Sequence, residues 1–274
     1  MLTTGQKCIL ELARGHGSGI SKLRLTKLLF LISREAGVYD FVPYHHGPFS
    51  FQMYHDLAGL KGKGLVAEDD VAVRLLRKDF PPPPGPLLSI LNRQSSKTKG
   101  LTDGQLLERI YSDHPWFTIM SLNDRRMDYS RNSKGITTIG YEGRSIDGFL
   151  DELLRQRVDI LVDVRNNPFS FKFGFNKSIL GDYLSRLGLE YVHMPEMGIA
   201  SSDRKKATTE QATHELFEAY RRSLDGLGAS FARIIEMGAG RKIALMCMEK
   251  DVRQCHRGEI ARRLREMGLE VVDL

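Results

Sequence analysis

Two thiols, an acid, a histidine and an arginine follow a short apolar run within residues 243–257, which read IALMCMEKDVRQCHR. The pattern predicts a buried strand, a polar loop and the first turn of a helix. Glu249 is of the type that transfers protons as a general acid or base. Cys255 stands beside His256 and Arg257 at the expected helix start, where a thiol pKa falls and the thiolate can act as a nucleophile.

A simpler use of the same helix start is anion binding. His256, Arg257 and the free N–H groups of the first turn could hold a phosphate, and Cys255 would then line the site rather than react. Cys247 ends the apolar run, and we expect it to pack in the core.

A zinc site is a further way of using these residues. Structural zinc takes four nitrogen or sulfur ligands, commonly with cysteines about two to four residues apart. Cys247 and Cys255 are eight positions apart, and a fourth ligand would have to be Cys8 or His193. We therefore predict neither a metal nor a cofactor.

The residues before this stretch repeat a strand–helix pattern, which predicts a parallel sheet with right-handed crossovers. The expected strands are residues 136–141, 159–164, 189–193, 242–247 and 269–273, and the expected helices are 146–157, 177–187, 209–237 and 256–267. We predict a doubly wound, mostly parallel α/β domain over residues 136–274. Ligands of such domains bind outside the carboxyl ends of the strands, so the polar residues after each strand should share one edge.

Two acids at this edge are the catalytic candidates, together with Tyr141. Asp163 and Glu249 could divide general acid and base work, with one kept ionised by Arg165 and the other made less acidic by burial. The alternative for Asp163 is a structural ion pair with Arg165. Tyr141, with Arg144 and Arg165, offers a stacking surface and anion contacts for a nucleotide taken out of its helix, or is simply half-buried. The remaining substrate-binding candidates are Glu142, Asn166 and Glu196.

Residues 1–130 show a different pattern, with three amphipathic helices followed by short strands at 65–67 and 71–75. This is the order of a winged helix-turn-helix domain, here with additional C-terminal helices, of which one is expected over 101–119. Ser50 can cap the third helix, which is the usual recognition element. The DNA-binding candidates on it are Gln52, His55, Lys61 and Lys63. The turn at 68–70 is acidic and suits phosphate poorly, so docking to a protein is the alternative.

Both halves resemble known families. Residues 41–50, FVPYHHGPFS, followed by DLAGLKGKGLV, resemble bacterial and archaeal winged-helix modules with an F-x-P-Y-x-x-G-P-[FY]-S signature. The motifs GYEGRS, LVDVRNNPFS with a downstream FNK, YVHMPEMG and CMEKDVRQCHR together resemble the uncharacterised family called domain of unknown function 488, over about residues 136–274. This resemblance implies the fold more than the function. Residues 171–173, FKF, stand where more arginine or serine is expected, so local substrate contacts should differ.

Composition sets the remaining bounds. The net charge is +6, which permits an acidic partner such as DNA without requiring one. The sequence has no apolar run of roughly 18–20 residues and no secretory leader pattern, and its three cysteines are too few and odd in number for a disulfide framework. We expect a cytoplasmic protein with no membrane association, and we leave open whether it forms a homo-oligomer.

Taken together, these features predict a hydrolase acting on DNA or nucleotides, in genome maintenance or in defence against foreign DNA, with double-stranded DNA and a flipped nucleotide as partner. N-glycosidic cleavage, as in a DNA glycosylase, is favoured, because no D-x-D or E-x-K cluster is present to hold Mg²⁺ for phosphodiester cleavage. The alternatives are a non-catalytic DNA-binding regulator whose α/β domain senses a small anionic ligand, a nuclease, or a cysteine-dependent enzyme.

Overall fold

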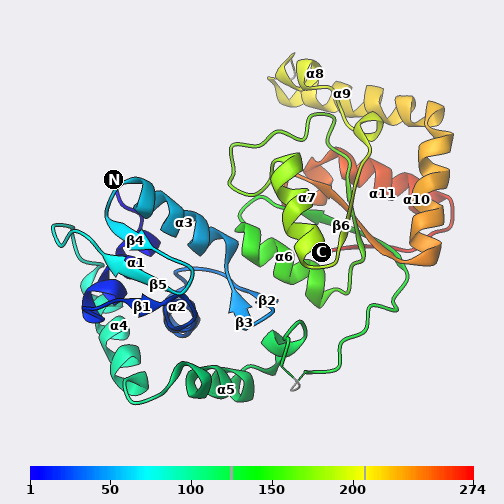
Figure 1. The fold of residues 1–274 in the computed structure, drawn as a ribbon. Coiled ribbons are helices and arrows are strands. Elements are labelled where there is room, and N and C mark those ends of the chain that lie inside the picture. Colours follow the sequence, from blue (N-terminus) through cyan, green and yellow to red (C-terminus); the bar gives the residue numbers. More distant parts are fainter. Residues whose placement is uncertain (124–125, 207) are drawn as a thin grey trace. The chain divides into compact units, whose positions relative to one another are not determined.

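The computed structural model describes residues 1–123, 126–206 and 208–274. The chain forms two compact units, Met1–Tyr129 and Ser130–Leu274, and each is described by itself (Figure 1).

The first unit is helical, with small antiparallel sheets. Its first three helices are capped by Thr3, Ser21 and Ser50, whose side chains each accept a hydrogen bond from the backbone N–H three residues later. Strands β1, β5 and β4 form one sheet in that order, and β2 pairs with β3 in a hairpin. The elements are α1 Thr4–Gly15, β1 Ile20–Ser21, α2 Lys22–Ala36, β2 Val42–Tyr44, β3 Gly47–Phe49, α3 Phe51–Gly62, β4 Val66–Glu68, β5 Ala72–Leu75, α4 Gly85–Thr98, α5 Asp103–Asp113 and η1 Pro115–Thr118.

Two parts of this unit differ from the sequence prediction. The helix expected over 101–119 is interrupted: α5 ends at Asp113, and a 3-10 turn begins at Pro115. A proline disfavours helical backbone in the residue before it, which explains the break. No range was predicted for helix α4, because residues 80–86, FPPPPGP, favour a stiff connector, and the helix begins within them at Gly85.

The second unit is built on a five-stranded sheet with the order β10-β6-β9-β7-β8. All neighbouring strands are parallel, so the predicted α/β class with a parallel sheet is confirmed. The strands are β6 Gly135–Gly140, β7 Ile160–Asp163, β8 Glu190–His193, β9 Lys242–Cys247 and β10 Val271–Asp273.

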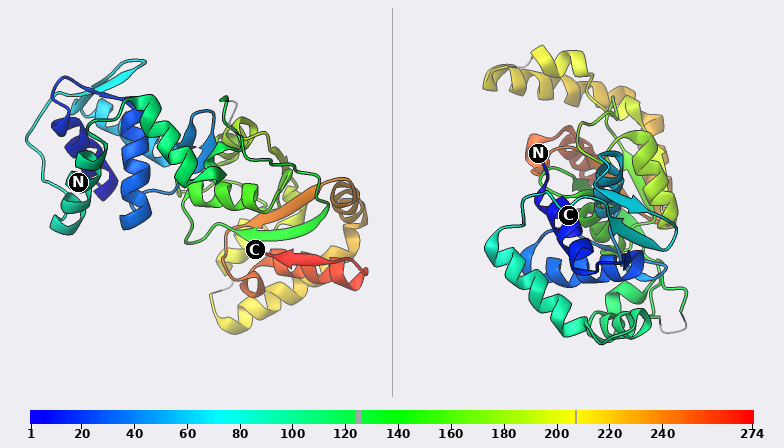
Figure 2. Two further views of the ribbon diagram at one scale, coloured as in Figure 1. Left: turned by 90° about the horizontal axis from the view of Figure 1, so that it is seen from below. Right: turned by 60° about the vertical axis from the view of Figure 1, so that its left-hand side comes forward.

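Helices cover both faces of this sheet (Figure 2). Ile160 and Val162 of β7 pack in one core cluster with Ile234 of α10 and Ile260 of α11. On α6, Phe149 is fully buried against Phe175. The helices of the unit are α6 Ile146–Arg155, α7 Lys177–Arg186, α8 Ser201–Lys206, α9 Glu210–Ser223, α10 Gly228–Gly240 and α11 His256–Glu266.

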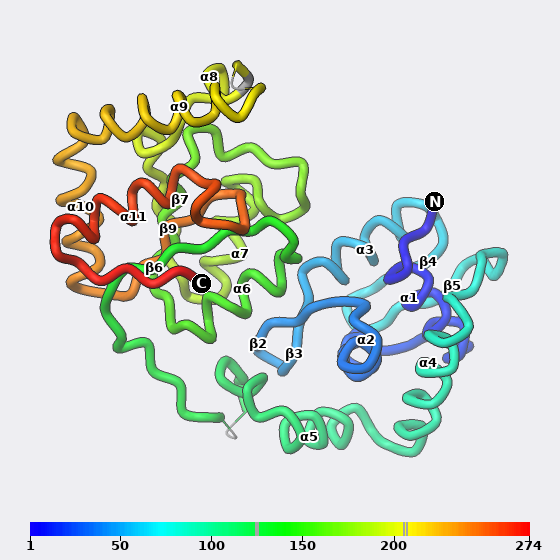
Figure 3. The backbone as a smooth tube through the Cα atoms, turned by 180° about the vertical axis from the view of Figure 1, so that it is seen from behind, coloured from blue at the N-terminus to red at the C-terminus, as the bar shows by residue number. Residues whose placement is uncertain are grey.

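The path from β8 back to β9 runs through α8, α9 and α10 (Figure 3). The single helix expected over 209–237 is wrong, because a 3-10 turn at Leu224–Gly226 separates α9 from α10. Among the residues that the structure describes, every helix is too short or too polar to cross a bilayer.

Candidate functional site

The strand order decides which polar groups meet at the carboxyl edge of the sheet. Strand β9 lies between β6 and β7, so Cys247 pairs with Gly140 and Met246 pairs with Asp163. The groups after β6, β9 and β7 are therefore neighbours. The group after β8 lies at the outer end of the sheet, where Glu196 accepts a hydrogen bond from Ser230 at 3.0 Å.

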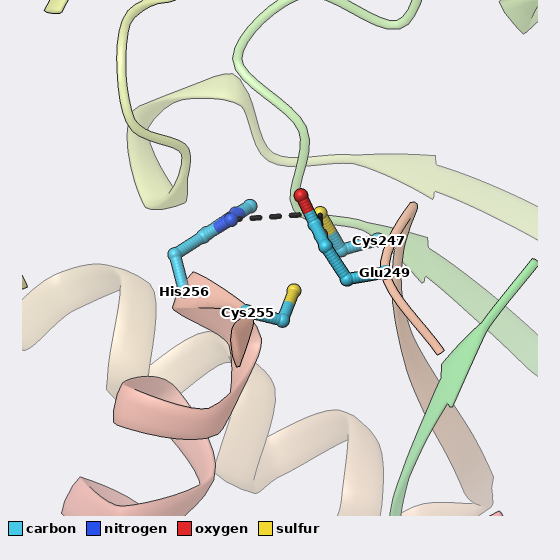
Figure 4. A group of neighbouring side chains, drawn as sticks. All are labelled: Cys247, Glu249, Cys255 and His256. Atoms are coloured by element: carbon cyan, nitrogen blue, oxygen red, sulfur yellow. Dashed lines mark hydrogen bonds between the residues drawn. The ribbon is translucent and has the colours of Figure 1, made fainter. Parts of the chain in front are cut away.

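Four side chains after β9 form what we call the thiol–histidine cluster, drawn in Figure 4: Cys247, Glu249, Cys255 and His256. One ligand atom from each lies within 4.8 Å of all the others. The thiol of Cys247 lies 3.2 Å from Glu249 Oε2 and 3.5 Å from His256 Nδ1. The sequence placed these residues together, but it did not indicate that all four converge.

The ring of His256 has a defined orientation. Its Nε2 lies 2.9 Å from the carbonyl oxygen of Val164, which can only accept a hydrogen bond. Nε2 therefore carries the proton, and the lone pair of Nδ1 faces the cluster. Arg204 of α8 also reaches this nitrogen through Nη2.

Arg204 forms an ion pair with Glu249 of the cluster. Its Nη1 donates to Glu249 Oε1 at 3.0 Å. Burial raises the pKa of Glu249, but hydrogen bonding with Cys255 and the charge of Arg204 outweigh it, so the pKa is lowered and the carboxylate is ionised at neutral pH. Arg204 was not among the predicted site residues.

The two thiols of the cluster differ in acidity. Burial alone would raise the pKa of Cys247. Hydrogen bonds with Cys255 and His256 outweigh this effect, so the pKa of Cys247 is lowered. Burial and the neighbouring Cys247 and Glu249 raise the pKa of Cys255. Cys255, which was predicted to line an anion site with nucleophilic use as an alternative, thus keeps its proton. Cys247, which was expected only to pack, is the more acidic thiol.

Arg257 differs from the expected anion contact. It is 1% exposed, and its guanidinium donates to the carbonyl oxygens of Glu249 and Lys250. It therefore fixes the backbone that carries Glu249. The same segment passes so close to β6 that a Cβ on Gly140 would lie 1.9 Å from the Glu249 carbonyl oxygen.

Asp163 and Arg165 form a buried ion pair. The backbone N–H and Nε of Arg165 donate to Oδ1 at 3.1 and 2.9 Å, and Nη2 donates to Oδ2 at 2.6 Å. The Tyr191 hydroxyl donates to the same Oδ2 at 2.6 Å. Asp163 is fully buried, so its place fits the ion-pair alternative better than a role in proton transfer.

Two adjoining cavities lie beside the cluster. The smaller, about 150 Å³, is lined by Arg165, Asn166, Arg204 and Cys247, and the larger, about 600 Å³, is lined by Glu142, Phe171 and Lys172. Both are also lined by Tyr141, Asn167, Phe169, Ser201 and Met248.

Tyr141, the predicted aromatic residue, lines both cavities, but the most exposed rings beside them are two phenylalanines. The Tyr141 ring is 4% exposed and stacks on Phe175, with ring centroids 4.2 Å apart. Phe169 and Phe171 are instead 58% and 98% exposed, and they meet edge to face. The signal that could have identified them is the run FSFKF at residues 169–173, which places phenylalanines in the loop after the strand expected at 159–164.

The other predicted substrate-binding residues have defined partners. Arg144 pairs with Glu152 at 4.0 Å, and Glu142 accepts from the backbone N–H of Lys250 at 2.9 Å. Asn166 donates to the carbonyl oxygen of Pro195 at 3.2 Å.

Comparison with known proteins identifies part of the second unit. Residues 145–264 match the model of a family described as Domain of unknown function DUF488, so this part of the chain is a DUF488 domain. The predicted resemblance is confirmed over that range, which contains Asp163 and the thiol–histidine cluster. No curated protein matches the sequence. The winged-helix resemblance of the first unit stays a prediction.

Proposed function

We propose that the second unit is a hydrolase that acts on a nucleotide within DNA or free in solution, with the N-glycosidic bond as its target. The observation that carries the proposal is the combination of exposed aromatic rings, arginines and an ionised carboxylate at one strand edge. Such a protein would serve in genome maintenance or in defence against foreign DNA.

The cavity walls suit the two parts of a nucleotide. Exposed Phe169 and Phe171 offer faces on which a base can stack, which is the sequence-tolerant way that proteins hold unpaired bases. Arg165 and Arg204 line the adjoining cavity and can contact phosphate oxygens. The larger cavity, about 600 Å³, is of the size that small-molecule sites have.

Glu249 is the residue we assign to proton transfer. It is held by two residues of the cavity wall, Arg204 and Cys247, and its side chain is 20% exposed. An ionised carboxylate can take a proton from a water molecule that attacks the sugar carbon while the base leaves. In this proposal Asp163 positions Arg165. Glu249 alone then transfers protons, in place of the predicted pair of carboxylates.

In this proposal the first unit binds the DNA as a winged helix. Its helices α1, α2 and α3 precede strands β4 and β5, and β1 pairs with β5, so that α3 would be the element that approaches DNA. His55, Lys61 and Lys63 are exposed on or next to α3, and Gln52 is half-buried. Lys61 also lies 3.8 Å from Glu68, an ion pair that a phosphate would have to compete with.

The test is to incubate the full chain with single- and double-stranded DNA, plain and base-modified, and with free nucleotides, with and without EDTA. Free base with an abasic site is expected. Glu249→Gln should lower the rate about 100-fold or more while leaving DNA affinity unchanged. Glu270→Gln, an exposed acid before β10 and at the other end of the strands, is the matched control. If neither base release nor strand cleavage occurs with any substrate, the hydrolase proposal is wrong.

A second candidate is a non-catalytic regulator that senses an anionic nucleotide. The complete engagement of Asp163 favours it, since a binding site needs no free carboxylate pair. In a sensor, the Glu249→Gln variant would alter the response of DNA binding to nucleotide, and no product would form.

A further inference from the structure

We propose that the thiol–histidine cluster binds one zinc ion, with the two cysteine sulfurs, His256 Nδ1 and a carboxylate oxygen of Glu249 as ligands. With nitrogen and sulfur ligands alone, a zinc site here would need Cys8 or His193 as a distant fourth ligand. Carboxylate oxygen is also a zinc ligand, and Glu249 supplies it from within the same loop.

The spacing of the donor atoms fits a tetrahedral ion. With metal–ligand bonds of about 2.0–2.3 Å, neighbouring ligands of a tetrahedral site lie roughly 3.3–3.8 Å apart. Cys247 Sγ lies 3.2 Å from Glu249 Oε2 and 3.5 Å from His256 Nδ1, and the whole set lies within 4.8 Å. Small side-chain shifts would centre an ion among the four atoms in Figure 4.

The imidazole is already arranged as a metal ligand. A histidine that binds zinc through one ring nitrogen usually donates its other N–H to a carbonyl or carboxylate, which fixes the ring. His256 donates Nε2–H to Val164 at 2.9 Å, and it is fully buried. Its Nδ1 lone pair therefore faces the two thiols and the carboxylate.

Charge supports the same conclusion. The Cys247 thiol lies 3.2 Å from Glu249 Oε2, and a cation that replaced the thiol proton would stabilise the thiolate and the carboxylate together. Two thiolates and a carboxylate around Zn²⁺ leave one negative charge, which Arg204 Nη1 can balance through Glu249. Nη2 of Arg204 would leave His256 Nδ1 when the ion binds, since both use the same lone pair.

The site borders the smaller cavity, because Cys247 and Arg204 line it. A water molecule could replace Glu249 as the fourth ligand, and the ion would lower the pKa of that water. The displaced Glu249 carboxylate could then accept the water's proton, which leaves hydroxide as the nucleophile. This use of the ion rests on the proposed function, whereas the site itself does not.

The experiment is cobalt substitution of the full chain, prepared metal-free under reducing conditions. One Co²⁺ per chain should bind, with the visible bands of a tetrahedral ion and near-ultraviolet thiolate-to-cobalt bands, and Zn²⁺ should displace it. Cys255→Ser should remove about half of the thiolate band intensity and weaken binding on the order of 100-fold or more. Cys8→Ser, at a buried cysteine in the first unit, is the matched control and should leave cobalt binding and the thiolate bands unchanged.

The wild-type spectrum tests the site even if a variant fails to fold, because the thiolate bands report coordination by sulfur without any substitution. Absence of stoichiometric binding, an octahedral spectrum without thiolate bands, or unchanged binding in Cys255→Ser would overturn the proposal. Metal binding without hydrolysis would leave the site standing and reject the proposed function, and hydrolysis by a protein that binds no metal would reject the site and leave the proposed function standing.

Discussion

Asp163 and Arg165 form an ion pair at the end of β7. Together with the Tyr191 hydroxyl, Arg165 donates hydrogen bonds of 2.6–3.1 Å to both carboxylate oxygens of Asp163. The remaining donor of the arginine, Nη1, reaches the Tyr141 hydroxyl at 3.3 Å. A buried carboxylate therefore positions a guanidinium against the cavity wall, and the pair connects the ends of β6 and β7.

Asp163→Asn should destabilise the second unit by about 3–5 kcal/mol, because it leaves the Arg165 cation buried without its counter-charge. Urea unfolding followed by circular dichroism measures this loss. The only tryptophan, Trp116, lies in the first unit, so its fluorescence should show an unchanged transition there. Asp182→Asn removes an exposed pair with Arg186 and should cost less than about 1 kcal/mol. Equal effects of the two substitutions would contradict the buried pair.

Gly140→Ala adds a single methyl group, which should distort the thiol–histidine cluster. The added Cβ would lie 1.9 Å from the Glu249 carbonyl oxygen, which is backbone and cannot turn aside. We expect lower stability of the second unit and weaker cobalt binding by the cluster. Gly181→Ala on α7 is the matched control, since nothing lies within 4 Å of its added Cβ, and it should stabilise the helix by about 0.5–1 kcal/mol. A harmless Gly140→Ala would show that the close approach is not required.

Local patterns allowed much of this fold to be predicted, and long-range pairing accounts for the rest. The run ILVD at β7 is buried at every position, as a central parallel strand should be, and the apolar stripe of α6 follows helical spacing. The strand order instead depends on pairs such as Ile136 with Ile243, which no local pattern encodes. Since the order decides which strand-end groups meet, the site could be predicted only as a set of candidates.

Individual residues show the same limit. Glu249 and Cys255 were found because they lie in one short motif, whereas Arg204 lies in α8 without a motif and reaches Glu249 only through the fold. Arg257 was predicted as an anion contact because it stands at a helix start, whereas its guanidinium donates to the carbonyl oxygens of residues 249–250. Burial of an arginine by its own loop carries no signal in residue spacing.

Lys27 should make the stability of the first unit depend on pH. Burial lowers the pKa of this lysine to about 7, with Nζ donating to the Pro48 carbonyl oxygen at 2.9 Å. The unfolded chain has the ordinary value of 10.5, so between about pH 7 and 10.5 the unfolded state binds more protons than the folded state. The free energy of unfolding must therefore rise with pH across this window and level off below about 7.

Lys27→Met should remove that rise, because the variant has no ammonium group to desolvate. Urea unfolding followed by Trp116 fluorescence at several pH values from 7 to about 10 gives the slope. Lys63→Met, at an exposed position after α3, is the control and should keep the wild-type slope. The same rise with pH in Lys27→Met as in the wild type would mean that another group causes it.

Phe171 should contribute to nucleotide binding and not to folding. Its side chain is 98% exposed, so Phe171→Ala should leave the unfolding midpoint unchanged. Stacking of a base on an aromatic ring contributes about 1–3 kcal/mol, so the affinity for a fluorescently labelled single-stranded oligonucleotide should fall roughly 5- to 150-fold, measured by anisotropy. Phe171→Leu keeps the apolar bulk but lacks the ring face. It should bind as weakly as Phe171→Ala if stacking is the interaction, and wild-type affinity in both variants would rule Phe171 out of the binding surface.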